Sequence, residues 1–196
     1  VGAVPVITTA TDTRGMFAVD LFAKRHNMRI VNPAMIKEIS GKILNGEPVG
    51  LTGGDTFMPM LRCTEARWNG QVYVTDNNGE YESGIQIITQ TGEQMAYKKT
   101  LKLVPMDIAV GIGCKKGKSV QEIEEAVNST FAENNLLKER IAVVSSIDIK
   151  ADEPGIAGFA RKYRVPYKTY SAEELSDIKG DFAESAFVKE KVGVDN

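Results

Sequence analysis

From residue 108 onward, short apolar runs alternate with amphipathic segments, and this alternation constrains the fold more than any other feature of the chain. Strands are expected over 108–113, 141–149 and 165–170. Helices are expected over about 119–134, 153–163 and 172–178, with a last helix around Glu184 to Lys191. This repeated order predicts a parallel sheet with helices on its faces. We therefore predict an α/β fold that ends in a parallel-sheet αβα domain.

The first third of the chain contains two helix signals. A short strand over residues 4–8 is expected to lead into a helix that Asp12 or Thr13 caps and that runs to about His26. Asn32 and Pro33 suit the N-cap and the first position of a second helix, which Gly46 ends. The predicted apolar face of this second helix consists of Ile36, Ile39, Ile43 and Leu44.

Two hairpin signals follow. Asn69-Gly70 and Asn78-Gly79 are typical of two-residue hairpin turns, so residues 62–89 are predicted to form a small antiparallel hairpin ribbon. A boundary is expected near Pro105. The predicted parts are residues 1–28 as the end of an N-terminal domain, 29–107 as a smaller α+β domain, and 108–196 as the C-terminal α/β domain.

Composition excludes several classes of function. The 24 basic and 26 acidic residues nearly cancel, so no overall basic field recruits nucleic acid. The longest apolar runs are of strand length, which predicts no membrane span. Two cysteines, Cys63 and Cys114, fit a reducing, cytoplasmic setting, although a single bridge between them stays open. One histidine, His26, argues against a protein-bound catalytic zinc, so a metal is expected only with a ligand.

Three loops are expected at sheet edges where ligands bind. Carboxyl ends of parallel strands and helix N-termini point to the same edge, and helix N-termini favour anions. The loops are residues 111–119, the opening stretch of the chain, and residues 167–171. Lysines at 115, 116, 118, 150 and 168 add positive charge, so the expected ligand is a small polyanion. The predicted binding residues are Gly111, Gly113, Cys114, Lys115, Lys116, Gly117, Ser119, Asp152, Glu153 and Ser171.

Simpler structural roles stand beside these functional ones. Ser119 and Ser171 each precede a glutamate by three residues, the capping-box spacing, and this favours helix caps over nucleophiles. Cys114 is either a packed structural cysteine or an activated thiol at a helix start. His26 is expected to place a favourable charge at the end of its helix. Glycines in residues 111–117 leave nucleotide binding as a minor alternative, since no Walker motif is present.

The stretch SIDIKADEPG, residues 146–155, contains the residues predicted to carry chemistry. Strand alternation would place Ser146, Asp148 and Lys150 on one face. Asp152 is predicted to cap the following helix, with Glu153 and Pro154 in its first turn. Asp148 and Lys150 lack such a structural reason, because positions in a buried parallel strand are normally apolar. They form either a structural ion pair or an acid–base pair.

Four motifs occur in a fixed order: GIGCKKGKS at 111–119, SIDIKADEPG at 146–155, YSAEEL at 170–175 and FVKEKVGV at 187–194. They resemble the C-terminal domain of the cobalamin biosynthesis protein G family, CbiG, the cobalt-precorrin-5A hydrolases. Residues 5–33 look like the join between that family's N-terminal and middle domains. The hairpin region between them is less distinctive.

The resemblance implies an enzyme of anaerobic cobalamin synthesis. Such a hydrolase opens the δ-lactone of cobalt-precorrin-5A and releases acetaldehyde, giving cobalt-precorrin-5B. The substrate is a cobalt-corrinoid with many acetate and propionate arms, so its metal arrives with it and no cofactor is expected on the protein. Other enzymes of the cobalamin pathway are the remaining expected partners.

Two departures from the family pattern bear on activity. A Ser-Gly-His-x-Gly-Gly-Ala-Asn segment is absent, and the C-terminal domain of similar proteins continues further. The chain is therefore expected to be a fragment that binds substrate without turnover if the missing histidine is needed. The family supplies no catalytic residue to carry over. Chemistry alone assigns Asp148 as base and Lys150 as acid or oxyanion partner.

A non-catalytic function is the main alternative. The C-terminal domain also resembles CobE, a stand-alone protein of the aerobic pathway, which suggests a protein that binds or hands on a tetrapyrrole. The match to the middle domain favours the hydrolase, because the stand-alone protein lacks that domain.

Overall fold

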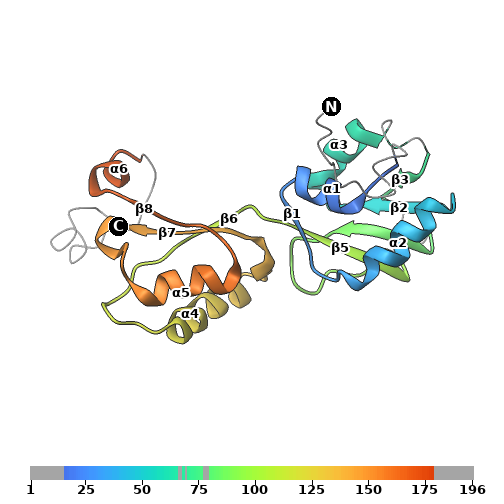
Figure 1. Cartoon of the computed structure of the whole chain (residues 1–196). Coiled ribbons are helices and arrows are strands. Elements are labelled where there is room, and N and C mark those ends of the chain that lie inside the picture. Colours follow the sequence, from blue (N-terminus) through green and yellow to red (C-terminus); the bar gives the residue numbers. More distant parts are fainter. Residues whose placement is uncertain (1–15, 66–67, 69, 77–79, 179–196) are drawn as a thin grey trace, which may run out of the picture. The chain divides into compact units, whose positions relative to one another are not determined.

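The computed structural model describes residues 16–65, 68, 70–76 and 80–178. The chain divides into two compact units, each of which is described by itself (Figure 1). Unit 1 consists of Val1–Met106 together with Asn135–Arg140, and unit 2 consists of Asp107–Asn134 and Ile141–Asn196. Residues 1–15 and 179–196, and with them the predicted strand 4–8, the caps Asp12 and Thr13 and the helix 184–191, lie outside the described residues.

Unit 1 is built on a mixed five-strand sheet. Its strands are β1 (Met28–Ile30), β2 (Val49–Thr52), β3 (Val72–Val74), β4 (Ser83–Ile87) and β5 (Lys99–Pro105), in the order β1-β5-β4-β2-β3. Only β1 pairs in the antiparallel sense, with β5, and the other neighbours are parallel. The helices are α1 (Val19–Arg25), α2 (Ala34–Leu44) and α3 (Gly54–Glu65), and a short 3-10 helix η3 spans Lys138–Arg140.

One apolar core joins the helices of unit 1 to alternate strand residues. Leu51, Ile85 and Leu101 of the three central strands are fully buried, as expected for parallel strands within a sheet. Helix α2 contributes Ile39 and Ile43, whereas Leu44, which was predicted for the same face, is 37% exposed. Phe22 of α1 and Phe17, which precedes that helix, each pack edge to face against Trp68 in the same core.

The predicted hairpin ribbon in residues 62–89 is wrong. Strands β3 and β4 both run parallel to β2, which lies between them in the sheet, so they cannot form a hairpin. Residues up to Glu65 belong to helix α3 instead. An Asn-Gly pair indicates only a local turn. It gives no sign that β2, which lies about twenty residues before β3 in the sequence, is inserted between β3 and β4 in the sheet. The α+β expectation for this part gives way to an α/β arrangement with one antiparallel edge strand.

Two helix starts in unit 1 differ from the predictions. Pro33 is the N-cap of α2, and Asn32 lies one residue before it. The Asn32 side chain instead donates to the Thr100 carbonyl at 2.9 Å and accepts from the Lys102 N–H at 2.8 Å. Helix α1 begins at Val19, so Phe17, which falls within the bounds of the predicted helix, precedes it. Gly46, with φ of 74°, follows α2 as predicted.

Unit 2 contains a three-strand sheet in which all strands are parallel. The strands β6 (Ile108–Gly111), β7 (Ile141–Ile147) and β8 (Tyr167–Tyr170) lie in the order β6-β7-β8. The helices are α4 (Val120–Glu133), α5 (Pro154–Tyr163) and α6 (Ala172–Ser176), with a 3-10 helix η4 at Asp148–Lys150. Helices α4 and α5 lie side by side along one face (Figure 1). The predicted parallel sheet of this part is confirmed.

Two glycines of α5 allow the two helices to approach closely. A Cβ added at Gly155 would lie 2.0 Å from the Lys118 carbonyl oxygen, and one at Gly158 would lie 2.4 Å from Val120 Cγ2. A side chain at either position would therefore push the helices apart. The close approach brings the N-terminus of α5 into contact with the loop that precedes α4. None of the described helices is long and apolar enough to cross a bilayer.

Candidate functional site

Three strand ends meet at one edge of unit 2. Because β6, β7 and β8 are adjacent and parallel, the segments after Gly111, Ile147 and Tyr170 all leave the sheet on the same side. Ile112 is tied to the neighbouring strand, since its N–H donates to the Ser145 carbonyl at 2.8 Å and its carbonyl accepts from Ser146 Oγ at 2.7 Å. Two of the three predicted loops thus share an edge. The opening stretch lies outside the described residues.

The stretch after β7 is not an extended strand. Strand β7 ends at Ile147, and Asp148–Lys150 form the 3-10 helix η4. The argument that strand alternation places Ser146, Asp148 and Lys150 on one face is therefore wrong. Asp148 is exposed, and Ile149 is 67% exposed. The turn is held from the next strand, because the Tyr167 hydroxyl donates to the Lys150 carbonyl at 2.7 Å.

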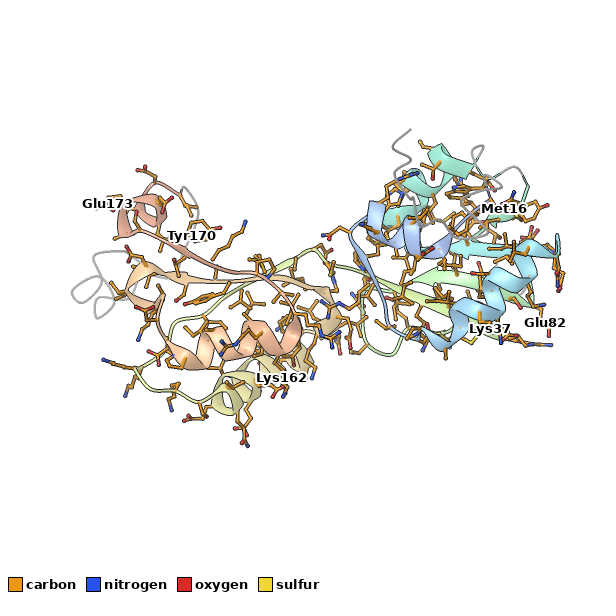
Figure 2. The ribbon with its side chains drawn as sticks, in the orientation of Figure 1. Met16, Lys37, Glu82, Lys162, Tyr170 and Glu173 are labelled. Carbon is orange, nitrogen blue, oxygen red and sulfur yellow. The ribbon has the colours of Figure 1, made fainter. Side chains whose placement is uncertain are left out.

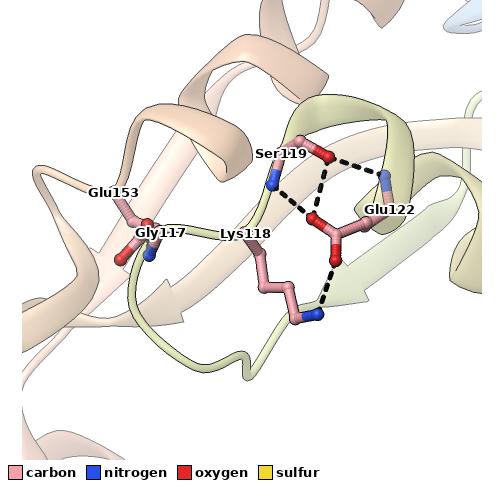
Figure 3. A network of polar contacts seen from close by, with 5 residues as sticks. All are labelled: Gly117, Lys118, Ser119, Glu122 and Glu153. Atoms are coloured by element: carbon pink, nitrogen blue, oxygen red, sulfur yellow. Dashed lines mark hydrogen bonds and ion pairs between the residues drawn. The ribbon is translucent and has the colours of Figure 1, made fainter.

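The buried carboxylate of Glu153 is the centre of this edge. Glu153 is only 6% exposed, and its Oε1 accepts the Gly117 N–H at 2.7 Å (Figure 3). Its Oε2 lies 3.7 Å from Lys150 Nζ, and the Lys150 side chain is itself 18% exposed. The ion-pair partner of Lys150 is thus Glu153 rather than Asp148. Buried charges of this kind are normally paired or functional.

The start of α5 is shifted by one residue from the prediction. Glu153 is the N-cap and Pro154 the first helical residue, whereas Asp152 is exposed and lies before the cap. The Glu153 side chain makes no capping bond to its own helix. Its carboxylate reaches the glycine loop instead, because Gly155 lets the loop backbone approach. Sequence spacing gave no signal for this contact.

The two serines are helix caps, as predicted. Ser119 Oγ accepts from the Glu122 N–H, and a Glu122 oxygen accepts from the Ser119 N–H at 2.9 Å (Figure 3). Ser171 and Glu174 repeat this capping box at α6. Both hydroxyls already make local bonds, which supports the capping role over a nucleophilic one.

Cys114 lies beside the same charges. Burial raises the pKa of the Cys114 thiol, the charge of Lys150 lowers it, and the carboxylate of Glu153 raises it. The net direction is upward, so the thiol stays protonated near neutral pH, which favours the packed structural role. Burial likewise raises the pKa of Tyr167. Cys63 and Cys114 are both free thiols.

A groove of about 490 Å³ runs beside this edge, between β6 and α4. Ile123, Val127 and Phe131 of α4 provide part of its apolar wall. Lys115 and Lys118 line the end nearest the start of α4, where Lys118 pairs with Glu122 at 2.6 Å. The groove thus combines an apolar wall with basic groups, which suits an amphipathic anion.

Other predicted features fall outside this edge or remain predictions. His26 caps the end of α1 and its ring lies 4.5 Å from that of Phe22. Burial, then the charge of Arg25, lowers the pKa of His26, which opposes the positive charge expected there. Among the described residues, no group of three or more His, Cys, Asp or Glu side chains is placed to share a metal ion. The absence of a cofactor stays a prediction.

Two protein-family models match different parts of the chain. Residues 108–196 match the family described as cobalamin synthesis G C-terminus, and residues 17–80 match the cobalamin biosynthesis central region. Together they cover most of the chain. The chain belongs to the CbiG family of cobalamin biosynthesis proteins.

Curated relatives carry the name cobalt-precorrin-5A hydrolase. The protein of Salmonella typhimurium is 28% identical over 194 residues, which are 98% of this chain and 55% of that protein. The protein of Priestia megaterium is 28% identical over 191 residues, which are 89% of this chain and 48% of that protein. The chain thus spans about half the length of these relatives.

One solved structure of a cobalamin-pathway protein is similar to part of this chain. The crystal structure of CobE, a protein from the cobalamin (vitamin B12) biosynthetic pathway, is 25% identical and covers 45% of this chain and 65% of that one. The TM-score between the two structures is 0.43.

Proposed function

We propose that this chain belongs to a cobalt-precorrin-5A hydrolase and supplies its corrinoid-binding edge. The observation that carries the proposal is the alignment over 98% of the chain with a relative of that name. The charge and shape of the edge in unit 2 support it. Lys115 and Lys116 offer exposed cations to acetate and propionate arms, and Ile149 and Tyr170 offer exposed apolar surface to the macrocycle (Tyr170 is labelled in Figure 2).

The reaction determines what the protein must provide. Water adds to the lactone carbonyl, the ring C–O bond breaks, and a carboxylate and a hydroxyl result. Loss of the hydroxyl proton then lets the carbon–carbon bond break, so that acetaldehyde leaves and the electron pair passes into the conjugated macrocycle. A base, an oxyanion partner and fixed carboxylate contacts are needed.

Asp148 and Lys150 remain our proposed base and oxyanion partner, on revised grounds. Asp148 is exposed at the end of the central strand, where a substrate can reach it. Lys150 is largely buried, and a cation screened from water stabilises a developing oxyanion more strongly. The backbone of residues 113–117 contributes donors for the carboxylate arms, except the Gly117 N–H, which Glu153 already occupies.

Asp148 can be tested by a single substitution. Asp148→Asn removes the proposed base and keeps the size of the side chain, so turnover should fall about 100-fold or more while corrinoid binding changes little. Acetaldehyde release and a spectral titration measure the two effects separately. Wild-type turnover in this variant would remove Asp148 from the mechanism.

The decisive experiment for the function is an assay of the wild-type chain. It is incubated anaerobically with cobalt-precorrin-5A, acetaldehyde is measured, and binding is followed by the corrinoid spectrum. Acetaldehyde would place the catalytic groups within these 196 residues. Binding without acetaldehyde would assign this chain a binding or carrier role, and no binding would refute the proposal.

A nucleotide-binding function receives less support. Residues 111–117 contain glycines but no Walker motif, so they lack the phosphate-binding sequence typical of nucleotide-binding loops. Thermal stabilisation by nucleotides but not by corrinoids would favour that alternative.

A further inference from the structure

Glu153 has a position that neither helix capping nor direct ligand binding explains. Its carboxylate is almost fully buried, although glutamate seldom is without a partner. It makes no bond to the first turn of α5. Each of its two oxygens faces a different part of the candidate site: Oε1 the Gly117 N–H at 2.7 Å, and Oε2 the Lys150 ammonium at 3.7 Å.

The bond to Gly117 fixes the glycine loop. Gly117 has φ of 83°, a left-handed conformation that residues with side chains rarely adopt. Gly113, also in this loop, has no atom within 4 Å of an added Cβ, so its side of the backbone is open. Loops of this composition lose much conformational entropy when they become ordered. A charge-assisted bond from a buried carboxylate offsets part of that loss.

The second oxygen compensates the charge of Lys150. At 3.7 Å the two groups form an ion pair without a direct hydrogen bond, so the ammonium keeps donors for another acceptor. Two other titratable groups lie close to Lys150. Cys114 lies within electrostatic range of its charge, and the Tyr167 hydroxyl binds its carbonyl oxygen. Neither carries a negative charge at neutral pH.

We propose that Glu153 is a positioning residue that holds the 113–117 loop and the Lys150 ammonium in the arrangement required for binding a substrate carboxylate. The inference deepens the proposed function, because it assigns how that site is organised. Glu153 itself does not touch the substrate. Its role replaces the direct substrate contact expected from the sequence.

Two substitutions separate the two contacts. Glu153→Gln keeps an oxygen that can accept the Gly117 N–H but removes the negative charge opposite Lys150. Glu153→Ala removes both. Glu133→Gln is the matched control, since it neutralises an exposed carboxylate at the far end of α4. Circular dichroism and thermal unfolding show whether each variant is folded.

The first readout is amide hydrogen exchange at Gly117, which needs no substrate. Exchange should be slowest in the wild type, rise slightly in Glu153→Gln, whose amide oxygen accepts the N–H without a charge, and accelerate about tenfold or more in Glu153→Ala, which loses the bond. The second readout is the rate at which an acylating reagent modifies Lys150. Without the opposing carboxylate the Lys150 side chain, now only 18% exposed, is released toward solvent and reagent, so the rate should rise roughly 3- to 10-fold in both variants.

The third readout compares the binding of two corrinoids, each measured by titration. One is cobyrinic acid, a cobalt corrinoid polycarboxylate, and the other is cobinamide, in which amides replace the carboxylates. Glu153→Ala should weaken binding of the polycarboxylate about tenfold, because the loop must be ordered on binding, with a smaller effect on the amide.

Unchanged Gly117 exchange and Lys150 labelling in Glu153→Ala would overturn the inference. Failure of the wild type to bind either corrinoid would refute the proposed function and leave those two readouts interpretable. If Glu153→Ala does not fold, Glu153→Gln alone decides the inference through Lys150 labelling.

Discussion

Gly84 of β4 lies beneath the ring of Tyr97 in unit 1. A Cβ added at Gly84 would lie 2.3 Å from Tyr97 Cε2, and one at Gly50, its register partner on β2, would lie 2.6 Å from Cε1. Tyr97 is 4% exposed, and burial raises the pKa of its hydroxyl. The ring therefore packs on bare backbone, and only glycine leaves room for it.

Gly84→Ala should accordingly destabilise unit 1. The methyl group must displace a buried ring, and overpacking of this kind costs about 1–3 kcal/mol. Gly41→Ala is the matched control, because nothing lies within 4 Å of its added Cβ in α2. There alanine should stabilise the helix by about 0.5–1 kcal/mol. Urea unfolding, followed by the fluorescence of Trp68, the single tryptophan, measures the change in the free energy of unfolding for both variants. Equal stability of Gly84→Ala and wild type would contradict the packing argument.

Residue roles that depend on neighbours in sequence were predictable, and those that depend on tertiary approach were not. Ser119 and Ser171 are caps because the partner glutamate lies three residues on, which the sequence displays. Glu153 is buried because the loop around Gly117 packs against the N-terminus of α5. Gly117 and Glu153 are 36 residues apart in sequence. No local pattern encodes that contact. The Asp148–Lys150 pairing was inferred from a strand that ends before either residue.

At the scale of elements, helix α4 depends on charge at its first turn. Hydrogen bonds from Lys118 and then from the Ser119 backbone lower the pKa of Glu122 to about 2, from an ordinary value near 4.5. A carboxyl whose pKa is lower in the folded state stabilises that state above its unfolded pKa. Its contribution is therefore complete at neutral pH and is lost as the pH falls from about 4.5 through about 2.

Glu122→Gln should remove this pH-dependent contribution. The variant should unfold at a lower temperature than wild type at pH 7, and the two melting temperatures should converge as the pH falls through about 2, where the wild-type carboxyl becomes protonated. Added salt should narrow the gap at pH 7, because the carboxylate is exposed and screened. Circular dichroism during thermal unfolding at several pH values measures the difference in melting temperature between the variant and the wild type. Glu125→Gln, which removes an exposed charge of α4 beyond its first turn, is the control. A gap that persists at pH 2 would show that the side-chain charge is not responsible.

The elements of unit 2 were predicted better than those of unit 1 for a physical reason. In unit 2 each parallel pair, β6·β7 and β7·β8, is joined by a helix, so sequence order and sheet order coincide. In unit 1 the order β1-β5-β4-β2-β3 separates strands that follow one another in sequence. Hairpin signals assume that consecutive strands are neighbours. The assumption fails here because β2 lies between β3 and β4.

At the scale of the molecule, the chain passes between the two units more than once. Residues 135–140, which connect α4 to β7 of unit 2, belong to unit 1. Leu136 forms a β-bridge with Gln90, and the Thr91 N–H donates to the Asn135 carbonyl at 3.0 Å. Arg140 Nη1 donates to the Thr89 carbonyl at 3.1 Å. A single cut near Pro105, the boundary expected from the sequence, would separate residues 135–140 from residues 89–91, with which they form these bonds.

Arg140→Met should loosen this segment without unfolding either unit. It removes a hydrogen bond from a charged donor, which makes local opening of residues 135–140 about tenfold easier. Trypsin should therefore cleave after Lys138 about tenfold faster in the variant, as measured by mass spectrometry of the fragments. Lys162→Met, a change on the exposed side of α5 where Lys162 pairs with Glu124, is the control and should leave that rate unchanged. Cleavage after Lys138 at the wild-type rate would mean that backbone pairing with Gln90 and Thr91 holds the segment alone, and the side-chain bond to Thr89 would then have no part in joining residues 135–140 to unit 1.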